Sequence, residues 1–334
     1  MLELFTDLVQ TPTWCALCIK PIPSAPSPMS ILSVGLSLTV GQVFSKYRTL
    51  GQWAKVYCQV IDGLPVTEKT KANRKCSLAH ILAGLGESRT ISAIRPHDIS
   101  GFVMRGCKDH PPLAKRVLIE AKAVFNEAMN YGWVDRNPAS QVKAPMVTVA
   151  RHRLTLDQWR LIHTQAVDHM PPWVSRMMVL ALVSGQRRSD IGKMQFSDVW
   201  DGHLHIIQAK TGARLALPLT LRMDAIGMTL AEAINACTGY APGDDHLLRK
   251  STGKPPGLPS LSARFEEARD AVVPVCKSGS PASLHECRSL SERLYREQGV
   301  NTMVLLGHTT QQMTDMYNDD RGLSAGKWKT LILS

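Results

Sequence analysis

The sequence has few acidic residues for its length. Its 334 residues include 28 Asp and Glu against 39 Lys and Arg, so the formal charge is +11 and the pI is about 9.4. A chain this basic is expected to bind a polyanion, and nucleic acid is the usual one. Ribosome-associated and membrane-surface proteins share this charge balance, so charge alone does not separate these classes.

The sequence also lacks an apolar run that could cross a membrane. The longest early one, residues 31–40 (ILSVGLSLTV), is far shorter than the roughly 20 residues that a span needs. The N-terminus carries Glu3 and Asp7 and no base before Lys20, which is unlike a secretory signal. We therefore expect a cytoplasmic protein without a membrane partner.

Cysteine frameworks and common catalytic motifs are missing as well. The eight cysteines are spread from Cys15 to Cys287 and are predicted to be reduced thiols. Cys15 and Cys18 form a C-x-x-C pair, but no second pair lies nearby to complete a zinc site, so chance is the better interpretation. There is no P-loop, H-E-x-x-H site, serine elbow or pair of catalytic carboxylates. We expect no metal and no cofactor.

The first half of the chain has the pattern of a helical domain. The length predicts about two domains, and 44% hydrophobic residues can build their cores. Residues 1–33 are an expected appendage that ends in a Pro- and Ser-rich linker. Residues 34–145 show helical periodicity, and helices are expected over 41–61, 69–85 and 111–133.

A basic segment separates this domain from the next. Residues 146–153 (MVTVARHR) are β-branched and basic, and are predicted to form an extended linker. A new helix then begins, with Thr155 as a candidate N-cap and Gln158 completing a capping box. Leu154 and Trp159 are spaced for a hydrophobic staple across its first turn.

The second domain, residues 154–325, is predicted to be mixed. A buried helix over 171–185 precedes two strands that flank a Lys-Thr-Gly turn. The expected strands are 202–210 and 213–219, and the later helices are about 222–237, 259–273, 283–299 and 310–317. Residues 326–334 form a short tail with apolar residues. The expected fold class is α+β: an all-helical domain, then a mainly helical domain with a small antiparallel sheet.

Six residues of the second domain occur where local structure alone does not demand them. They are Arg187, Lys210, His285, Arg288, His308 and Tyr317. Cations can stabilise the non-bridging oxygens of a phosphate, and a lysine or histidine can supply a proton. A tyrosine hydroxyl becomes a nucleophile once cations stabilise its phenolate. The set is therefore consistent with metal-free cleavage of a phosphodiester through a covalent intermediate.

Each of these residues alone has a simpler interpretation. Arg187 can be a base at a helix C-terminus, and Lys210 a solvated turn residue. A His-x-x-Arg pair on a helix is often surface decoration, and Tyr317 can be a packing residue. Their joint occurrence in this order favours the functional interpretation.

In that order the motifs resemble the tyrosine recombinase (phage integrase) family, in particular the integrases of lambdoid phages. The matching segments are SGQRRSDIGKMQFSDVWDGHLHIIQAKTGARLALPL, LHECRSLSERLYREQG and LLGHTTQQMTDMYNDDRG. The resemblance spans about residues 150–325, and residues 34–145 resemble the family's SAM-like core-binding domain. It implies a site-specific DNA recombinase that mediates integration or excision of a phage or mobile element.

The resemblance implies that Arg187 and Arg288 bind the scissile phosphate and stabilise its transition state. Lys210 would protonate the 5′-oxygen leaving group. One departure from the family pattern is Arg188, a second base beside the first arginine, where an apolar residue is common. Another is Cys287, which replaces a larger apolar residue inside H-x-x-R and could loosen packing or make the site oxidisable.

The two histidines and the tyrosine would complete the implied site. His285 would contact the phosphate and manage the proton of the nucleophile, and His308 would donate a hydrogen bond to the phosphate. Tyr317 would form a 3′-phosphotyrosyl link without metal or ATP. We expect it in a loosely held segment, because only some protomers of a tetramer cut at one time. The tail 326–334 is predicted to dock on a neighbouring protomer.

The implied partner is double-stranded DNA at attachment-type sites, bound by a homotetramer in the cytoplasm of a bacterial host. Accessory DNA-bending proteins are further candidate partners. The bases expected to contact DNA are Lys69, Lys71, Arg74, Lys75, Lys115, Arg116, Lys143, Arg151 and Arg153. Residues 1–33 hold one base against two acids, unlike the basic arm-binding domain of lambdoid integrases.

Two alternatives remain open at this point. A type IB topoisomerase-like enzyme would relax supercoils without exchanging partners, which the short length and the motifs disfavour. A non-catalytic, DNA-binding prophage remnant is disfavoured by the six intact positions, although the unusual N-terminus keeps it open.

Overall fold

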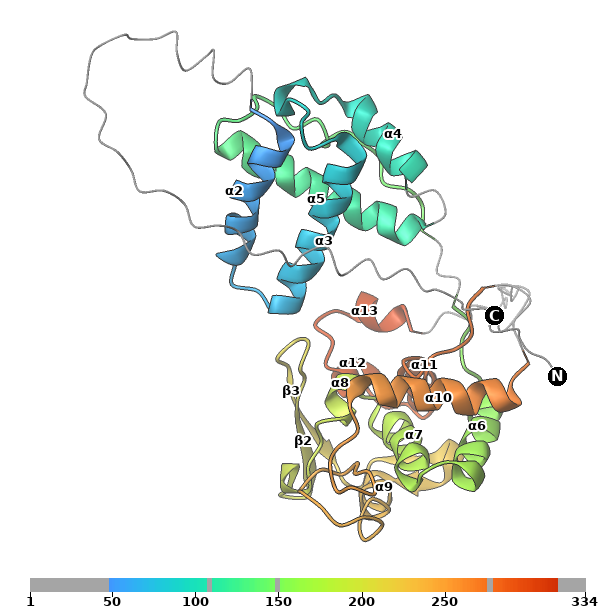
Figure 1. Cartoon of the computed structure of the whole chain (residues 1–334). Coiled ribbons are helices and arrows are strands. Elements are labelled where there is room, and N and C mark those ends of the chain that lie inside the picture. Colours follow the sequence, from blue (N-terminus) through green and yellow to red (C-terminus); the bar gives the residue numbers. More distant parts are fainter. Residues whose placement is uncertain (1–47, 107–109, 148–150, 275–278, 318–334) are drawn as a thin grey trace, which may run out of the picture. The chain divides into compact units, whose positions relative to one another are not determined.

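The computed structural model describes residues 48–106, 110–147, 151–274 and 279–317 (Figure 1). The chain divides into two compact units, Met1–Val147 and Thr148–Ser334, here called the N-terminal and C-terminal units. The predicted appendage 1–33, the start of the helix predicted over 41–61 and the tail 326–334 lie outside the described residues.

The described part of the N-terminal unit is helical, as predicted. Its helices are α2 (Leu50–Asp62), α3 (Glu68–Leu85), α4 (Pro96–Gly106) and α5 (Pro111–Asn130), with a 3₁₀ turn, η2 (Ile91–Ala93), before α4. Between residues 48 and 147, the only described β contact is an isolated bridge, Thr49 to Thr90. The sequence did not predict α4, but α3 and α5 lie within a few residues of their expected bounds.

Helix α5 packs against the other three helices and carries much of the core (Figure 1). Two prolines open it, and its apolar stripe, including Val117, Ala121 and Phe125, is buried. Trp53 of α2 is fully buried against this stripe, and its indole Nε1 donates to the Val124 carbonyl at 3.1 Å. A buried tryptophan normally finds such a partner for its N–H.

Arg74, one of the bases expected to contact DNA, forms an ion pair inside this unit. Arg74 Nε donates to Glu120 Oε1 at 3.0 Å, and the Tyr57 hydroxyl donates to the same oxygen at 2.7 Å. Glu120 is only 6% exposed, so it needs a cation beside it. The guanidinium of Arg74 therefore neutralises a buried carboxylate, and a contact of Arg74 with DNA stays a prediction.

The C-terminal unit is mainly helical with two small antiparallel sheets, which confirms the predicted fold class. One sheet has the order β1-β2-β3 and the other pairs β4 with β5. The strands are β1 (Val199–Trp200), β2 (His203–Ile207), β3 (Arg214–Pro218), β4 (Arg222–Met223) and β5 (Met228–Thr229). The helices are α6 (Leu156–His169), α7 (Pro172–Ser184), α8 (Arg188–Ile191), α9 (Leu230–Asn235), α10 (Leu258–Val272), α11 (Glu286–Glu297), α12 (Thr302–Leu306) and α13 (Gln311–Asp315).

The predicted start of α6 is confirmed. The Thr155 hydroxyl accepts from the Gln158 backbone N–H at 3.1 Å, and the Gln158 side chain accepts from the Thr155 N–H at 3.2 Å. This is the reciprocal pattern of a capping box. Leu154 and Trp159 are both buried in the same core.

The helix predicted over 222–237 is wrong in its first half. Residues 222–229 form a small hairpin, in which Arg222 pairs with Thr229 and Met223 with Met228. Gly227 has φ 64°, a left-handed conformation that suits glycine and ends the 3₁₀ turn before β5. Only α9, capped by Thr229, is helical in this stretch.

Helix α7 lies at the centre of the C-terminal unit and packs against α6, α9, α10 and α11 (Figure 1). All but two of its residues are buried, as the predicted buried helix requires. It ends at Gly185, where φ is 65° and an added Cβ would lie 2.9 Å from the Ser291 hydroxyl of α11. Because no other residue fits this close approach without strain, the chain turns here directly beside α11.

Candidate active site

Arg187 follows this turn and points to a buried glutamine. Its Nη1 donates to Gln208 Oε1 at 2.7 Å. Gln208 is 1% exposed, and its Nε2 donates to Gln186 Oε1 at 2.9 Å and to the Leu306 carbonyl at 3.0 Å. Its Oε1 also accepts from the Thr211 hydroxyl at 2.8 Å. All four hydrogen-bonding positions of the amide are therefore used, which fixes its orientation.

Gln208 also begins the turn between β2 and β3. Its backbone N–H donates to the Ala213 carbonyl at 2.9 Å, and Gly212 N–H donates back to the Gln208 carbonyl at 2.8 Å. This turn carries Lys210, whose side chain is exposed. One buried side chain thus connects the lysine turn to Arg187.

Arg288 lies in α11 and is almost fully buried, with 1% exposure. Its Nη1 donates to the Gly185 carbonyl at 2.7 Å, and its Nη2 donates to the Leu306 carbonyl at 2.6 Å. The same Nη2 lies 3.2 Å from His308 Nε2. The Leu306 carbonyl therefore accepts from both Gln208 and Arg288, and it connects the two arginines through one oxygen.

His308 reaches this position because the chain reverses at Gly307. That residue ends α12 with φ 61°, and an added Cβ would lie 3.0 Å from Gln208 Nε2. Nδ1 of His308 lies 2.9 Å from the Thr314 hydroxyl of α13. The ring therefore has a polar partner on each nitrogen, which fixes its plane.

Tyr317 completes the cluster. Its hydroxyl lies 3.4 Å from His285 Nε2, and its ring stacks on that of His308 with centroids 5.5 Å apart. The guanidinium carbon of Arg288 lies 5.9 Å from the centre of the tyrosine ring. Four of the six residues singled out in the sequence thus meet at one point: His285 and Arg288 at the start of α11, His308 after α12 and Tyr317 after α13.

The electrostatic environment keeps His285 neutral. Although part of its surface is exposed, the packing of its ring and the charges of Arg288, Arg151, Arg187 and Lys210 lower its pKa to about 4. Lys210 therefore acts on the site by charge, although none of the described hydrogen bonds joins it to the other five residues.

The pKa values of His308 and Arg288 are lowered by the same causes. Burial and the nearby charges of Arg288 and Arg187 lower the pKa of His308 to about 4. Burial and the charge of Arg187 lower the pKa of Arg288 to about 10. Such an excess of positive charge in a half-buried site is stabilised by an anion, and its geometry suits a phosphate.

The backbone of the segment that carries Tyr317 is held by two hydrogen bonds. The Ser289 hydroxyl of α11 donates to the Tyr317 carbonyl at 3.0 Å. Arg153 Nη2 donates to the Met316 carbonyl at 2.6 Å. Neither contact was predicted, because each joins residues far apart in the sequence and no motif marks it.

Arg153 is a correction to the predicted DNA contacts. Its guanidinium is 2% exposed and pairs with the buried carboxylate of Glu286 at 3.0 Å. A side chain in that position cannot lie on a DNA backbone, so that prediction is wrong. Two of the other bases expected to contact DNA, Lys71 and Lys75, both contact Asp62. Exposed bases are Lys69, Lys115, Arg116, Lys143 and Arg151.

Two further expectations bear on the site. Cys287 is fully buried, and burial raises the pKa of its thiol, so the suggested sensitivity to oxidation does not fit this structure. Arg188, the unusual second base, is exposed and donates to the Ser262 hydroxyl of α10 rather than joining the cluster.

The described residues contain no group of three or more His, Cys, Asp or Glu that could hold a metal ion. They also contain no helix long and apolar enough to cross a membrane.

Comparison with known proteins gives consistent matches over both units. The profile of the Phage integrase family matches residues 152–322. Prophage integrase IntE of Escherichia coli (strain K12) is 42% identical over 268 residues, covering 77% of this chain and 69% of that protein. The integrase of Escherichia phage lambda is 31% identical over 283 residues, covering 82% of this chain and 77% of that protein.

Solved structures agree. A lambda integrase dimer bound to a COC′ core site matches with a TM-score of 0.80 at 29% identity, covering 88% of this chain and 83% of that one. A lambda integrase tetramer bound to a Holliday junction matches with a TM-score of 0.79 at 28% identity, covering 89% and 84%. The chain therefore belongs to the phage integrase family and is a tyrosine-type site-specific DNA recombinase.

Proposed function

We propose that Tyr317 is the nucleophile of this recombinase and that the surrounding residues bind and activate one DNA phosphate. The observation that carries the proposal is the convergence of two histidines and a buried arginine on one tyrosine. The Tyr317 hydroxyl is 3.4 Å from a histidine nitrogen in a site with excess positive charge. A phosphate between Arg187 and Arg288 would neutralise that charge and face the hydroxyl.

The reaction then proceeds in balanced steps. The Tyr317 oxygen attacks phosphorus, and the bond to the 5′ oxygen breaks as a 3′-phosphotyrosyl ester forms. Neutral His285 accepts the phenolic proton, and Lys210 donates a proton to the leaving 5′ oxygen. In the reverse direction, the 5′-hydroxyl of a partner strand attacks the ester. The energy of the original bond is kept in that ester, so the proposal needs neither metal nor ATP.

His308 and Arg288 would stabilise the charge that develops on the non-bridging oxygens. In the free protein His308 is neutral because its pKa is lowered to about 4, and its Nε2 accepts from Arg288. The negative charge of a bound phosphate would favour the protonated ring, which can donate to it. Removing one well-placed donor of this kind typically costs about 100- to 1,000-fold in rate.

The proposed partner is duplex DNA carrying attachment-type sites, bound by a homotetramer, as in the lambda integrase tetramer on a Holliday junction. Accessory DNA-bending proteins would assist assembly, and the reaction would take place in the bacterial cytoplasm. If the five exposed bases named above contact phosphates, the logarithm of the binding constant should fall with the logarithm of salt concentration at a slope near −4.5, or about −0.9 for each contact.

A covalent trap tests this proposal. Nicked duplexes from the DNA flanking this gene release a short strand on cleavage, so the phosphotyrosyl protein cannot rejoin and accumulates. Without metal, the wild type should give a shifted band on a denaturing gel, Tyr317→Phe none, and the matched control Tyr131→Phe the full amount, because Tyr131 is exposed in the N-terminal unit.

Other outcomes point to the alternatives. A folded, DNA-binding wild type without a covalent band on any flank would favour the prophage remnant. A band together with relaxation of supercoiled plasmid but no exchange between two sites would favour the topoisomerase-like reaction.

A further inference from the structure

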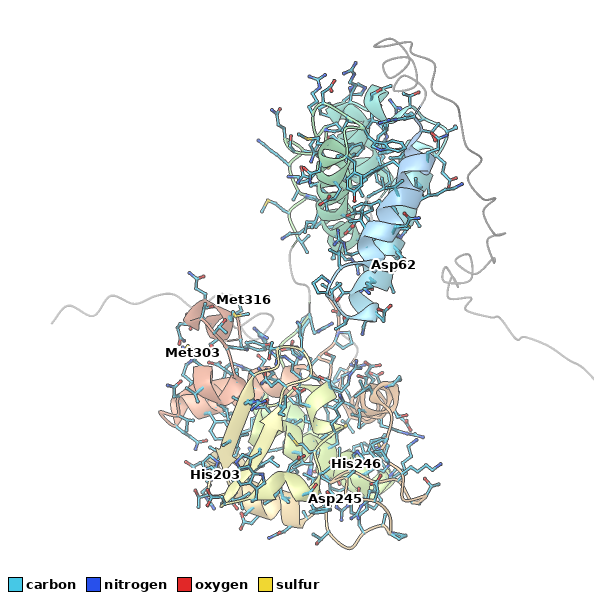
Figure 2. All side chains as sticks on the ribbon, turned by 90° about the vertical axis from the view of Figure 1, so that its left-hand side faces the viewer. Asp62, His203, Asp245, His246, Met303 and Met316 are labelled. Carbon is cyan, nitrogen blue, oxygen red and sulfur yellow. The ribbon has the colours of Figure 1, made fainter. Side chains whose placement is uncertain are left out.

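The backbone carbonyl of the residue before Tyr317 accepts a hydrogen bond from an arginine in a distant part of the chain. Arg153 donates to the Met316 carbonyl at 2.6 Å, and Met316 is the residue before Tyr317. The two residues of the pair are 163 positions apart. Figure 2 labels Met316 at the end of α13, where its side chain is 70% exposed.

The two methionines of this segment contribute little apolar packing, although the Tyr317 ring packs against the core of the C-terminal unit. Met313 is 46% exposed, so neither methionine beside the tyrosine is buried. Helix α13 is attached through buried Thr314, which lies 2.9 Å from His308 Nδ1, and through the ion pair of Arg296 with Asp315. After α13, two hydrogen bonds hold the backbone carbonyls, from Arg153 to Met316 and from Ser289 to Tyr317. Of these, only the first has a charged donor, and charge-assisted hydrogen bonds are the stronger kind.

The second terminal nitrogen of the Arg153 guanidinium is held by a buried carboxylate. Nη1 donates to Glu286 Oε2 at 3.0 Å, and both side chains are at most 4% exposed. Glu286 follows His285 directly and opens α11. The guanidinium thus connects the helix start next to His285 with the carbonyl next to Tyr317, the two residues whose side chains meet at 3.4 Å.

The backbone of Arg153 is anchored on both sides. The His152 N–H donates to the Ser280 carbonyl at 3.0 Å, and Arg293 Nη2 of α11 donates to the Leu154 carbonyl at 2.6 Å. A long side chain held at its base and at both ends of its guanidinium has little freedom left. A buried ion pair often adds little net stability, because desolvation of the two charges offsets their attraction. The Arg153–Glu286 pair can instead serve to position the groups that it connects.

We propose that Arg153 is a positioning residue for the reaction: through the Met316 carbonyl it sets the Tyr317 hydroxyl against His285 and the scissile phosphate. This inference rests on the proposed role of Tyr317 as the nucleophile. Arg153 touches neither the tyrosine side chain nor the two phosphate-binding arginines among its described contacts, so its loss should affect attack by Tyr317 and leave the phosphate site intact.

The test removes the pair without leaving an orphaned buried charge. The variant is Arg153→Met with Glu286→Gln, which keeps the volumes similar. The matched control is Arg269→Met with Asp270→Asn, because buried Arg269 also pairs with a carboxylate and donates to a carbonyl, that of Ala282 at 2.6 Å. Neither residue of the control pair contacts the tyrosine segment in the described hydrogen bonds.

The readout separates positioning from general structure. Each double variant is measured on nicked duplex in two ways: attack by Tyr317, and attack by added hydrogen peroxide in a Tyr317→Ala background. In the second reaction the hydroperoxide oxygen bonds phosphorus as the 5′ oxygen leaves, and the proton that peroxide gives up balances the one that the leaving oxygen gains. This reaction needs the phosphate site but not the tyrosine.

The proposal predicts that the Arg153 pair variant loses about 100-fold in tyrosine attack, as expected for a reacting group displaced by about 1 Å, with peroxide attack unchanged. The Arg269 control should leave both reactions unchanged. A parallel loss of both reactions in the Arg153 variant, or a loss of neither, would overturn the proposal. Absence of a covalent band in the wild type would overturn the proposed function itself.

Discussion

The buried amide of Gln208 offers the sharpest perturbation of the site. Gln208→Glu keeps the shape of the side chain and replaces its NH2 group by an oxygen. The two bonds that Nε2 donates, to Gln186 Oε1 at 2.9 Å and to the Leu306 carbonyl at 3.0 Å, become contacts between oxygens. At the same time a negative charge arises 2.7 Å from Nη1 of Arg187.

The expected loss of stability follows from which partners are left without a donor. The Leu306 carbonyl still accepts from Arg288, so only Gln186 Oε1 becomes a buried acceptor without its donor. An orphaned buried group costs about 1–3 kcal/mol, and repulsion between the oxygens adds to it while the new charge pair offsets part. A net loss of about 2 kcal/mol would lower the melting temperature by about 4–8 °C for a unit of this size.

The expected loss of activity is larger. A carboxylate beside Arg187 neutralises a charge that should face the phosphate, and we expect covalent complex formation to slow by about 100- to 1,000-fold. The assay is single-turnover trapping on nicked duplex at saturating protein, with thermal melting alongside. Gln165→Glu, on the half-buried side of α6, is the matched control and should change neither quantity.

A lower melting temperature with an unchanged rate would refute this reasoning, because the amide would then serve the fold alone. An unchanged melting temperature would show that the hydrogen bonds described for Gln208 are not formed in solution.

Three further predictions use other parts of the chain. In the free protein, proton NMR titration should find His285 and His308 neutral down to about pH 4. The melting temperature should fall as pH drops from 6.5 toward 4, because the unfolded chain then binds protons that the folded chain excludes. Titration of either ring near pH 6.5 would contradict this prediction. Alkylation of the native protein at pH 8, mapped by mass spectrometry, should modify exposed Cys76 and spare Cys287, and rapid modification of the latter would refute its burial. Gly84→Ala should lower the urea midpoint through a loss of about 1–3 kcal/mol, because its Cβ would lie 2.0 Å from a phenylalanine ring of α4; an unchanged midpoint would mean that α3 and α4 do not pack this closely.

Local signals in the sequence predicted a large part of the fold. Helix α5 has two prolines at its start and an apolar stripe at helical spacing, and α6 begins with a capping box that needs only residues three apart. Both signals are complete within one turn or one helix, so they hold whatever the rest of the chain does.

The hairpin of β4 and β5 shows where such signals are insufficient. Residues 222–229 (RMDAIGMT) have helix-compatible residues and only one glycine, yet tertiary contacts select a hairpin. Met223 is fully buried in the core of the C-terminal unit, a tertiary contact that the pattern of residues 222–229 does not show.

The candidate site divides in the same manner. The residue types and order that point to phosphodiester chemistry can be found in the sequence, and the structure brings Arg288, His308, His285 and Tyr317 together. The residues that hold these side chains in place cannot be identified from the sequence. Gln208 and Arg153 act through backbone carbonyls 98 and 163 residues away, and a carbonyl has no sequence signature.

The measurement that tests the account most directly is the identity of the residue joined to DNA. The covalent complex from a nicked duplex would be digested with nuclease and protease, and the nucleotide-bearing peptide sequenced by mass spectrometry. The account predicts a single modified peptide with the nucleotide attached through its 3′ phosphate to Tyr317. Attachment at any other residue, or a 5′-phosphate linkage, would contradict it.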